Sequence, residues 1–454
     1  MIGSNPASGT HGDAQERIGR PARRGLRTHF AGSTGRRFHL EFQPCSCKVL
    51  SNQSVLYFIC RALSALRGLS ASGQSTMKRL SKRPSLPTIV DIFSGVGGLS
   101  LGAARAGFNV AGAVELDPHP SSAHRKNFPH AEHLEQDIGL LSGNELKKRL
   151  NLKHIDGIVG GPPCQGFSSI GHRNMSDPRN LLFVQFFRMV QEVKPKFFMA
   201  ENVPGILASE TLKIREIALA HVEDDYEVLA PIRLVASSFG VPTTRERIFF
   251  IGYRKAHVDK LVAGDFVPPK DVTTTTVNDA LAGLPTKIDP DWQTEENSWK
   301  RVDSVGSDFF ATRLHNCRPK GVGDPKSVAR LRNKLEVSGF LGTKHCREVI
   351  RRFAKVEPGM KDTVSKCVRL KPDGLCPTLR AGTDKDHGSF QAVRPLHPTE
   401  DRVITPREGA RLQGFPDWFQ FAPTKWHSFR QLGNSVSPIL AECVLRVIHR
   451  AVEG

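Results

Sequence analysis

The sequence lacks paired cysteines and long apolar runs. Its 9 cysteines are odd in number and scattered, and no two have the C-x-x-C spacing. This excludes a zinc ribbon and a secreted disulfide framework, so we expect no metal and a reducing, cytoplasmic location. No apolar run approaches the roughly 20 residues of a membrane-spanning helix. The run 55–60 is far too short for that purpose.

Acidic residues are scarce in two segments. Residues 1–90 contain 14 Lys and Arg against 3 Asp and Glu, and residues 311–371 contain 16 against 5. The rest of the chain has 34 against 37, so these two segments carry the whole excess charge of +19. Such a balance points to a polyanionic partner, although a basic run can also be a solvated surface.

Residues 1–86 form a basic N-terminal extension that we expect to be disordered. Up to residue 76 it is rich in Gly, Ser and Arg, and its composition cannot bury a core. Its scarcity of acids is also typical of an organelle transit peptide. A third interpretation is that translation begins at Met77 and that the preceding residues are an upstream extension.

Residues 87–255 alternate short apolar runs with helical stretches, which predicts an α/β domain with a parallel sheet and crossover helices. The expected strands are 88–93, 110–115, 133–137, 155–159, 196–200 and 247–253. In open α/β sheets, functional residues gather at the carboxyl ends of the strands. We therefore expect the site at those ends.

The remaining sequence divides into two further regions. Residues 256–400 lose the alternating rhythm and are predicted to form a second, smaller domain. Residues 401–454 are expected to bridge the two domains and return to the first one. Within them, apolar residues at helical spacing predict a helix over 438–452.

Cys164 lies in the segment GGPPCQGFS at 160–168. Its prolines and glycines exclude a helix and fix a rigid loop after a strand. A lone cysteine is usually an inert buried residue. In this context, with Glu201 expected at the end of a neighbouring strand, Cys164 is instead a candidate nucleophile and Glu201 a candidate acid.

A glycine loop follows the first expected strand, with Gly95, Gly97 and Gly98. Such a loop lets a ligand approach the backbone and the amino end of the next helix. A dinucleotide site would favour a glycine at position 100, where this chain has Ser100. Glu115, at the end of the second strand, is suited to accept hydrogen bonds from two ribose hydroxyls.

Eight motifs occur in one order, and together they resemble the cytosine-C5 DNA methyltransferase family over residues 88–454. They are DIFSGVGG (91–98), VELD (114–117), QDI (136–138), GGPPCQGFS (160–168), AENV (200–203), RER (245–247), RVITPRE (402–408) and GNSV (433–436). The resemblance implies an S-adenosylmethionine-dependent, Rossmann-like sheet with a target-recognition domain at 256–400. It also implies double-stranded DNA as the substrate and a nucleoid-associated protein.

The resemblance also implies roles for the catalytic and cofactor-binding motifs. Cys164 would add to C6 of a flipped-out cytosine, Glu201 would act at N3, and Arg245 and Arg247 would act at O2. The implied S-adenosyl-L-methionine site comprises Phe93, Ser94, Gly95, Gly97, Gly98, Glu115, Leu116, Asp137, Ile138, Pro163, Asn434, Ser435 and Val436. The segment 168–180, with Gly171, Asn174 and Pro178, is expected to be a mobile loop that closes over the flipped base, and Ser168, Ser169 and Arg173 are candidate DNA contacts.

The chain departs from the family pattern at two positions. Thr243 stands where the family usually has Gln, which puts the hydrogen-bond role of that position in doubt. Ser437 stands where the family usually has Pro.

Three alternatives remain at this stage. A tRNA-methylating branch shares the catalytic motifs but tends to carry a Cys-Phe-Thr signature and an aromatic-rich target region, whereas this chain has only 3 tyrosines. A catalytically silent DNA-binding module would not need Cys164, Glu201 and Arg247 together. A nicotinamide-dependent oxidoreductase would explain only the glycine loop.

The compact layout resembles prokaryotic restriction–modification methyltransferases. The expected partner is therefore a cognate restriction endonuclease, unless the enzyme is an orphan regulator, and we expect a monomer. The recognition sequence does not follow from these residues, because base readout depends on which few side chains reach the major groove.

Overall fold

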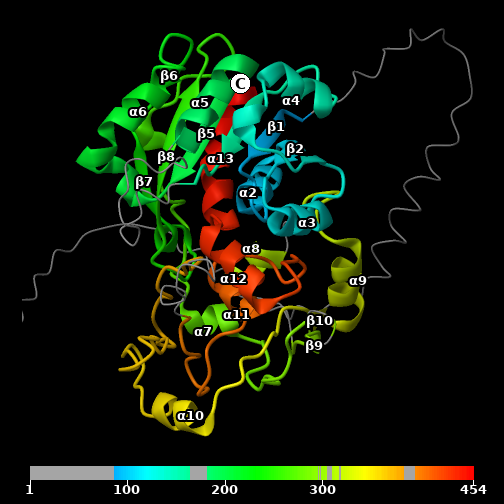
Figure 1. Cartoon of the computed structure of the whole chain (residues 1–454), viewed down its shortest axis with the longest axis vertical. Helices are drawn as coiled ribbons and strands as arrows, with labels where there is room; N and C mark the ends of the chain where they lie inside the picture. The colour runs from blue at the N-terminus through cyan, green and yellow to red at the C-terminus, as the bar shows by residue number, and fades with distance from the viewer. Residues whose placement is uncertain are drawn as a thin grey trace, which may run out of the picture. The chain divides into compact units, whose positions relative to one another are not determined.

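The computed structural model describes residues 86–163, 181–294, 296, 298–303, 309–315, 318–382 and 394–453. Its centre is an eight-stranded sheet with the order β3-β2-β1-β4-β5-β8-β6, and β7 pairs with β8 outside that path (Figure 1). The strands are β1 (Thr88–Ile92), β2 (Asn109–Val114), β3 (Glu132–Leu134), β4 (Gly157–Gly160), β5 (Phe197–Asn202), β6 (Glu227–Val228), β7 (Ile232–Val235) and β8 (Glu246–Tyr253). β1 to β5 pair in parallel, and β8 runs antiparallel to β5, β6 and β7.

The six strands expected from the sequence are all present, and the mixed α/β fold with a mostly parallel sheet is confirmed. The expectation that the strand at 247–253 is parallel is wrong. No crossover helix separates β7 from β8, and only a short 3-10 turn, Ala236–Phe239, lies between them. Because a parallel connection needs a long crossover, this short link reverses the chain.

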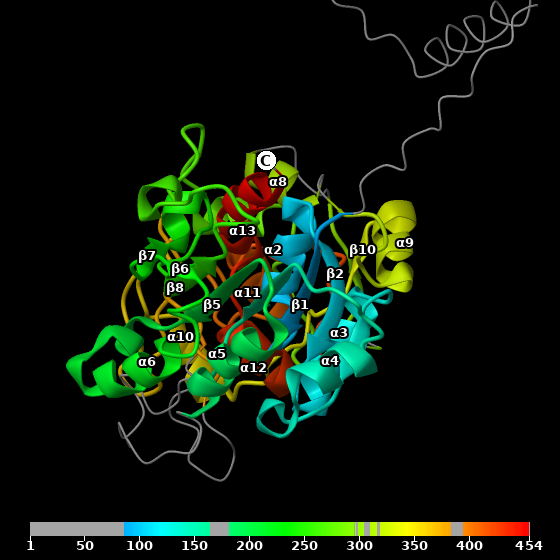
Figure 2. The same cartoon turned by 90° about the horizontal axis from the view of Figure 1, so that it is seen from above.

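Helices cover both faces of the sheet. Ile89 and Val159 point into one core with α2 (Gly98–Ala106) and α13 (Pro438–Glu453). The alternate residues Val90 and Ile158 point into the other core. The helices on that second face are α4 (Gly143–Arg149), α5 (Leu181–Val193) and α6 (Leu212–Leu219). Figure 2 shows α4 and α5 on the opposite side of the sheet from α2 and α13.

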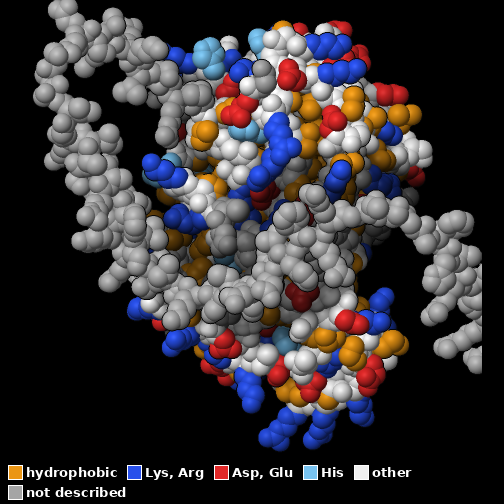
Figure 3. All heavy atoms as spheres, turned by 180° about the vertical axis from the view of Figure 1, so that it is seen from behind, with side chains coloured by type: hydrophobic (Ala, Val, Ile, Leu, Met, Phe, Trp, Pro, Cys, Tyr) orange, Lys and Arg blue, Asp and Glu red, His pale blue; other side chains and the backbone are white. Residues whose placement is uncertain are grey.

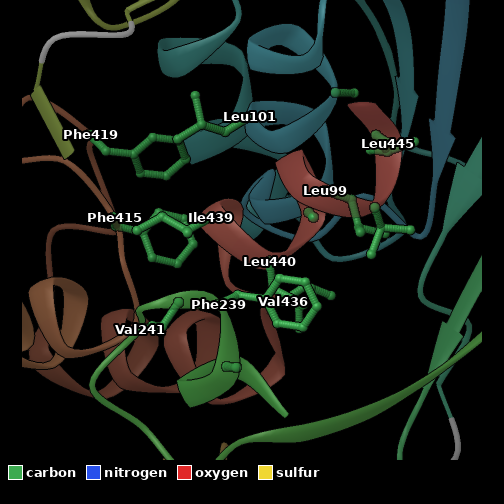
Figure 4. Packing of buried hydrophobic residues seen from close by; sticks show 14 of the residues in the cluster. Leu99, Leu101, Phe239, Val241, Phe415, Phe419, Val436, Ile439, Leu440 and Leu445 are labelled. Carbon is green, nitrogen blue, oxygen red and sulfur yellow. The ribbon is translucent and has the colours of Figure 1, made fainter. Parts of the chain in front are cut away.

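The predicted C-terminal helix is confirmed as α13, which packs along α2. Figure 4 shows Leu99 and Leu101 of α2 beside Ile439 and Leu440 of α13. The two helix backbones approach closely at Gly102, where an added Cβ would lie 2.4 Å from the Ala441 Cβ and 2.7 Å from the Glu442 backbone nitrogen. This contact fixes the C-terminal segment against the first strand-helix unit.

Gly102→Val is expected to destabilise the fold by about 2 kcal/mol or more, since an overpacked side chain would meet the α13 backbone. The measurement is the free energy of unfolding in urea. Gly264→Val is the matched control, because nothing lies within 4 Å of a Cβ at Gly264. Equal stabilities of the two variants would contradict this account of the α2–α13 contact.

The segment after β8 contains short helices and one two-stranded sheet. These are α7 (Val277–Leu281), β9 (Lys300–Arg301), α8 (Phe309–His315), α9 (Pro325–Lys334), β10 (Glu336–Val337) and α10 (Arg347–Phe353). α10 has a small hydrophobic cluster of its own, formed with Cys367 and Leu396. Arg369 stabilises α10 and the residues that follow it, because its guanidinium donates to the carbonyl oxygens of Phe353 and Val356. The domain boundaries after residues 86, 255 and 400 stay predictions.

Two further helices, α11 (Pro406–Leu412) and α12 (Lys425–Asn434), precede α13. Arg407 of α11 is buried, and its guanidinium donates to the carbonyl oxygens of Ser338, Pro416 and Phe419. This ties the segment after β10 to the C-terminal segment. In the part of the chain that the structure describes, no helix is both long and apolar enough to cross a membrane.

Candidate active site

The glycine loop between β1 and α2 has an unusual backbone. Phe93, Gly95 and Gly97 have φ angles of 60°, 54° and 101°, so all three are left-handed. Glu115, just after β2, holds the loop in place. Its Oε2 accepts from the Gly95 amide at 2.9 Å, and its Oε1 accepts from the Asp117 amide at 2.9 Å. Each carboxylate oxygen keeps a further lone pair for a ligand hydroxyl.

The next strand ends supply the other sequence-predicted binding residues. Leu116 is 62% exposed, which is high for a large apolar side chain and leaves a surface for a flat ring. Asp137 is half-buried and accepts from the Gly139 amide at 2.8 Å, while Ile138 is buried. Glu115 and Leu116 therefore follow β2 directly, and Asp137 and Ile138 come a few residues after the end of the parallel strand β3.

The C-terminal motif returns to the glycine loop. An added Cβ at Gly98 would lie 2.3 Å from both the Ser435 Oγ and the Val436 carbonyl oxygen. Ser435 and Val436 are buried, and Asn434, the last residue of α12, is exposed. The structure thus brings together two motifs from opposite ends of the described chain, as the predicted cofactor site requires.

Buried polar atoms without a partner among the described residues occur in and next to the motifs that meet at this loop. They include the Asp91 Oδ1, the Ser94 Oγ and the Ser437 Oγ. Buried polar groups in folded proteins are nearly always hydrogen-bonded, so such atoms indicate a ligand or water. Together with the carboxylate of Glu115, they suit a polar ligand with hydroxyl groups. These residues therefore fit S-adenosylmethionine.

Glu201 and Arg247 form a buried ion pair at the ends of β5 and β8. The Arg247 Nε contacts the Glu201 Oε1, and the two side chains are only 9% and 8% exposed. Burial raises the pKa of Glu201 above its ordinary value, and Arg247 and Arg245 oppose the shift. A carboxyl in this setting can hold a proton more readily than one in water.

This ion pair lies beside the segment that leads to Cys164. An added Cβ at Gly161 would be 3.1 Å from the Glu201 Oε2. The Asn202 Nδ2 donates to the Pro162 carbonyl oxygen at 3.4 Å. Pro163 is half-buried, whereas Cys164 and the predicted loop 168–180 lie outside the described residues.

Arg245 has partners that the sequence did not suggest. Its side chain is 1% exposed, and it donates to the Leu379 carbonyl oxygen at 3.0 Å and to the Gly433 carbonyl oxygen at 2.7 Å. Both contacts depend on segments more than 100 residues away, so no local motif could reveal them. They favour a positioning role, in which Arg245 holds Gly433 and hence the motif 434–436. Its catalytic role stays a prediction.

A buried chain of polar side chains was missed as well. The Ser100 Oγ lies 2.6 Å from the Asp91 Oδ2 and 2.9 Å from the His124 Nε2, and the His124 Nδ1 lies 2.8 Å from the His133 Nε2. The only sequence signal was an acid near the end of an apolar strand. Among the described residues, no group of three or more His, Cys, Asp and Glu could hold a metal ion.

Known proteins that resemble this chain show its family. The family of C-5 cytosine-specific DNA methylases matches residues 87–450. The type II methyltransferase M.XorII of Xanthomonas oryzae is 38% identical over 81% of this chain and 85% of its own length. M.DdeI of Desulfomicrobium norvegicum is 32% identical over 78% of this chain and 87% of its own length.

Two solved structures share the fold. A protein of E. coli described as a prophage-encoded DNA modification methyltransferase is 47% identical, with a TM-score of 0.74, and covers 81% of this chain and 100% of its own. The Dnmt2 methyltransferase of S. pombe is 18% identical, with a TM-score of 0.53, and covers 81% of this chain and 99% of its own. At that identity, the second likeness concerns the fold alone.

Fold, strand-end residues and relatives together define the class as the α/β methyltransferases whose members use S-adenosylmethionine. Within that class, the chain belongs to the family of C-5 cytosine-specific DNA methylases, and it is a DNA (cytosine-5-)-methyltransferase.

Proposed function

We propose that this enzyme methylates C5 of a cytosine flipped out of double-stranded DNA, through a covalent bond between the Cys164 sulfur and C6. The observation that carries the proposal is the buried Glu201–Arg247 pair, which lies against Gly161 in the segment leading to Cys164. An acid and a positively charged side chain beside the candidate thiol suit a cytosine ring, which gains electron density when a thiolate adds to it.

The chemistry explains why these residue types are needed. Cytosine C5 is a poor nucleophile until a thiolate adds to C6 and makes the ring electron-rich. Negative charge then develops toward N3, where the carboxyl of Glu201 can donate its proton. Arg247 uses its Nε for Glu201 and one terminal nitrogen for the Glu246 carbonyl oxygen. Another N–H group of its guanidinium can donate a hydrogen bond to O2 of the base.

The second substrate enters at the glycine loop. S-adenosylmethionine, when bound there, supplies the methyl group as an electrophile. Glu115 would accept from the ribose hydroxyls, Phe93 and Leu116 would contact the adenine, and Asp137 would accept from its amino group. Because the base must leave the duplex to reach Cys164, binding costs a few kcal/mol of unstacking and unpairing.

The names of the relatives support a biological setting. Several are type II methyltransferases of bacteria, which supports a restriction–modification role with a cognate endonuclease that acts on the same site. An orphan modification enzyme would have the same chemistry. We further propose a monomer that acts on chromosomal DNA in the cytoplasm.

Base-resolution methylation sequencing tests this function directly. The chain is expressed in a host that has no cytosine methylation, and 5-methylcytosine is expected within one short sequence motif. Absence of methylated cytosine in the presence of soluble, folded protein would contradict the proposed function. Methylated tRNA with unmethylated DNA would favour the RNA-methylating alternative.

α10 and the loop after it are the proposed contact to DNA phosphates. Arg347, Arg351 and Lys355 are exposed there. Figure 3 shows Lys and Arg side chains projecting from the same end of the described structure that carries α10 in Figure 1. Arg352 does not belong to this set, because its Nε donates to the buried Asp362 Oδ1 at 2.7 Å. Its role is to hold the loop that follows α10.

Neutralising Arg351 and Lys355 to Gln is expected to weaken DNA binding and to reduce its salt dependence. The slope of log K against log salt should fall by about 0.9 for each DNA phosphate that the protein no longer neutralises. The measurement is fluorescence anisotropy with a labelled duplex at several salt concentrations. The matched control replaces Lys148 and Lys153, two exposed lysines in and after α4, by Gln. An equal decrease of the slope in both double variants would contradict a specific role for α10.

A further inference from the structure

Asp91 is a buried acid that the proposed chemistry does not use. It lies in β1, two residues before Phe93, and it is 0% exposed. Its Oδ2 accepts from the Ser100 hydroxyl in the first turn of α2, and its Oδ1 has no partner among the described residues. Asp91 therefore lies directly beneath the loop that is proposed to bind the cofactor.

The hydrogen bonds around Asp91 supply no positive charge. Since the Ser100 hydroxyl donates to Asp91, it accepts from the His124 Nε2, and the His124 Nδ1 accepts from the His133 Nε2. Burial lowers the pKa of His124 well below its ordinary value and lowers the pKa of His133 to about 4. Both rings are therefore neutral near pH 7, and they act as dipoles only.

The charged group that acts on Asp91 is another carboxylate, that of the half-buried Glu115. The pKa of Asp91 is raised to about 7, chiefly by burial and to a smaller extent by Glu115, whereas the hydrogen bonds from Ser100 oppose the shift. Burial also raises the pKa of Glu115. On the neighbouring elements, β4 has no titratable side chain, α3 contributes His124 and Arg125, and β3 contributes His133. Negative charge thus accumulates under the loop at the ends of β1 and β2.

We propose that Asp91 senses the charge of the ligand in the glycine loop. Its carboxyl is ionised while the positively charged S-adenosylmethionine is bound, and it takes up a proton from solvent when S-adenosylhomocysteine replaces it. On methyl transfer the bond from sulfur to the methyl carbon breaks, the sulfur keeps the electron pair, and its positive charge disappears. The inference rests on the proposed function, because it presupposes that the cofactor binds at this loop.

Because ligand binding is coupled to proton binding by Asp91, the affinities of the two ligands are expected to depend differently on pH. A ligand that favours the ionised carboxyl releases a proton on binding, so its affinity rises with pH through the pKa of the free protein. The affinity of the neutral-sulfur product should stay level or fall. Each unit by which the sulfonium lowers the pKa of Asp91 changes the ratio of the two affinities by up to about tenfold. Higher pH would therefore favour exchange of product for fresh cofactor.

Titration calorimetry with S-adenosylmethionine and S-adenosylhomocysteine tests the proposal. At about pH 7, in two buffers of different ionisation enthalpy, the wild type is expected to release more protons than Asp91→Asn on binding S-adenosylmethionine. The two proteins should not differ on binding S-adenosylhomocysteine. The cofactor's own amino group titrates equally in both proteins, so the difference isolates Asp91. Equal proton release by the two proteins with both ligands would overturn the proposal.

Two further variants keep the test decisive. Ser100→Ala removes a hydrogen bond to the carboxylate, so the proton release should move to higher pH. His427→Gln removes another titratable ring, which stacks on His119 beside the start of α3 and should leave the release unchanged. If the pH at which the proton is released shifted in His427→Gln and not in Ser100→Ala, Asp91 would not be the group that releases it.

The apoprotein offers a readout without any ligand. The unfolded chain loses the Asp91 proton near the ordinary pKa of 3.8, whereas the folded protein keeps it until about pH 7. The stability of the fold therefore falls as the pH rises from about 4 to about 7 and stays at the lower level above that. Asp91→Asn should therefore melt at a higher temperature than the wild type at about pH 8, with a difference that shrinks as the pH falls toward 5. If the wild type bound neither ligand, the proposed function would be contradicted. If it bound both ligands and released as many protons as Asp91→Asn with each, only the role of Asp91 would be contradicted.

Discussion

Cys164→Ala is expected to abolish methyl transfer, with the rate falling by at least about 10⁴-fold, a scale typical of enzymes that lose their nucleophile. Without a thiolate at C6 the cytosine ring stays electron-poor, and C5 cannot take a methyl group. Binding of the duplex should persist, because the proposed phosphate contacts lie on α10. The measurement is the transfer of labelled methyl groups to DNA that contains the recognition sequence.

Cys346→Ala is the matched control for this variant. Cys346 is the exposed cysteine before α10, and its side chain makes no capping hydrogen bond. Its replacement should leave the transfer rate unchanged. If Cys164→Ala transferred methyl groups at the rate of Cys346→Ala, another residue would have to be the nucleophile.

Glu201→Gln is expected to slow methyl transfer by about 10²-fold or more, since an amide cannot donate the proton that general acid catalysis requires at N3. The wild-type rate should fall as the pH rises through the raised pKa of Glu201, because the protonated carboxyl is the active form. That alkaline fall should be absent in Glu201→Gln. Single-turnover rates over a range of pH measure both effects.

The control for Glu201→Gln is Glu216→Gln, on the exposed surface of α6. It carries the same change of charge and should keep the wild-type rate and pH profile. A Glu201→Gln enzyme with the wild-type alkaline fall would show that another group titrates in that range. The role of Glu201 as the acid would then be wrong.

The sequence predicted the fold and the strand ends well, because both follow from local patterns. Alternating apolar runs indicated the positions of β1 to β5, and residues such as Glu115 and Glu201 directly follow or end those strands. A short apolar run does not show whether its strand is parallel or antiparallel to its neighbours. The direction of β8 was therefore predicted wrongly, and the short link from β7 decides it.

Local sequence motifs could not show which distant residues the arginine side chains contact. Arg245 occurs in the same motif as Arg247, yet one side chain donates to the Leu379 and Gly433 carbonyl oxygens and the other pairs with Glu201. Arg352 lies beside the exposed Arg351 in α10, yet its side chain pairs with the buried Asp362. In each case a tertiary contact, set by packing of distant segments, determines which donors remain for a ligand.

The covalent bond from Cys164 to C6 is the central claim, and a duplex with 5-fluorocytosine at the target position tests it most directly. Fluorine at C5 cannot leave as a proton does, so elimination of the thiol is blocked after methyl transfer. With S-adenosylmethionine present, the wild type should form a protein–DNA adduct that survives denaturing electrophoresis. Cys164→Ala should form none. An adduct formed equally by Cys164→Ala, or none formed by an active wild type, would contradict the account.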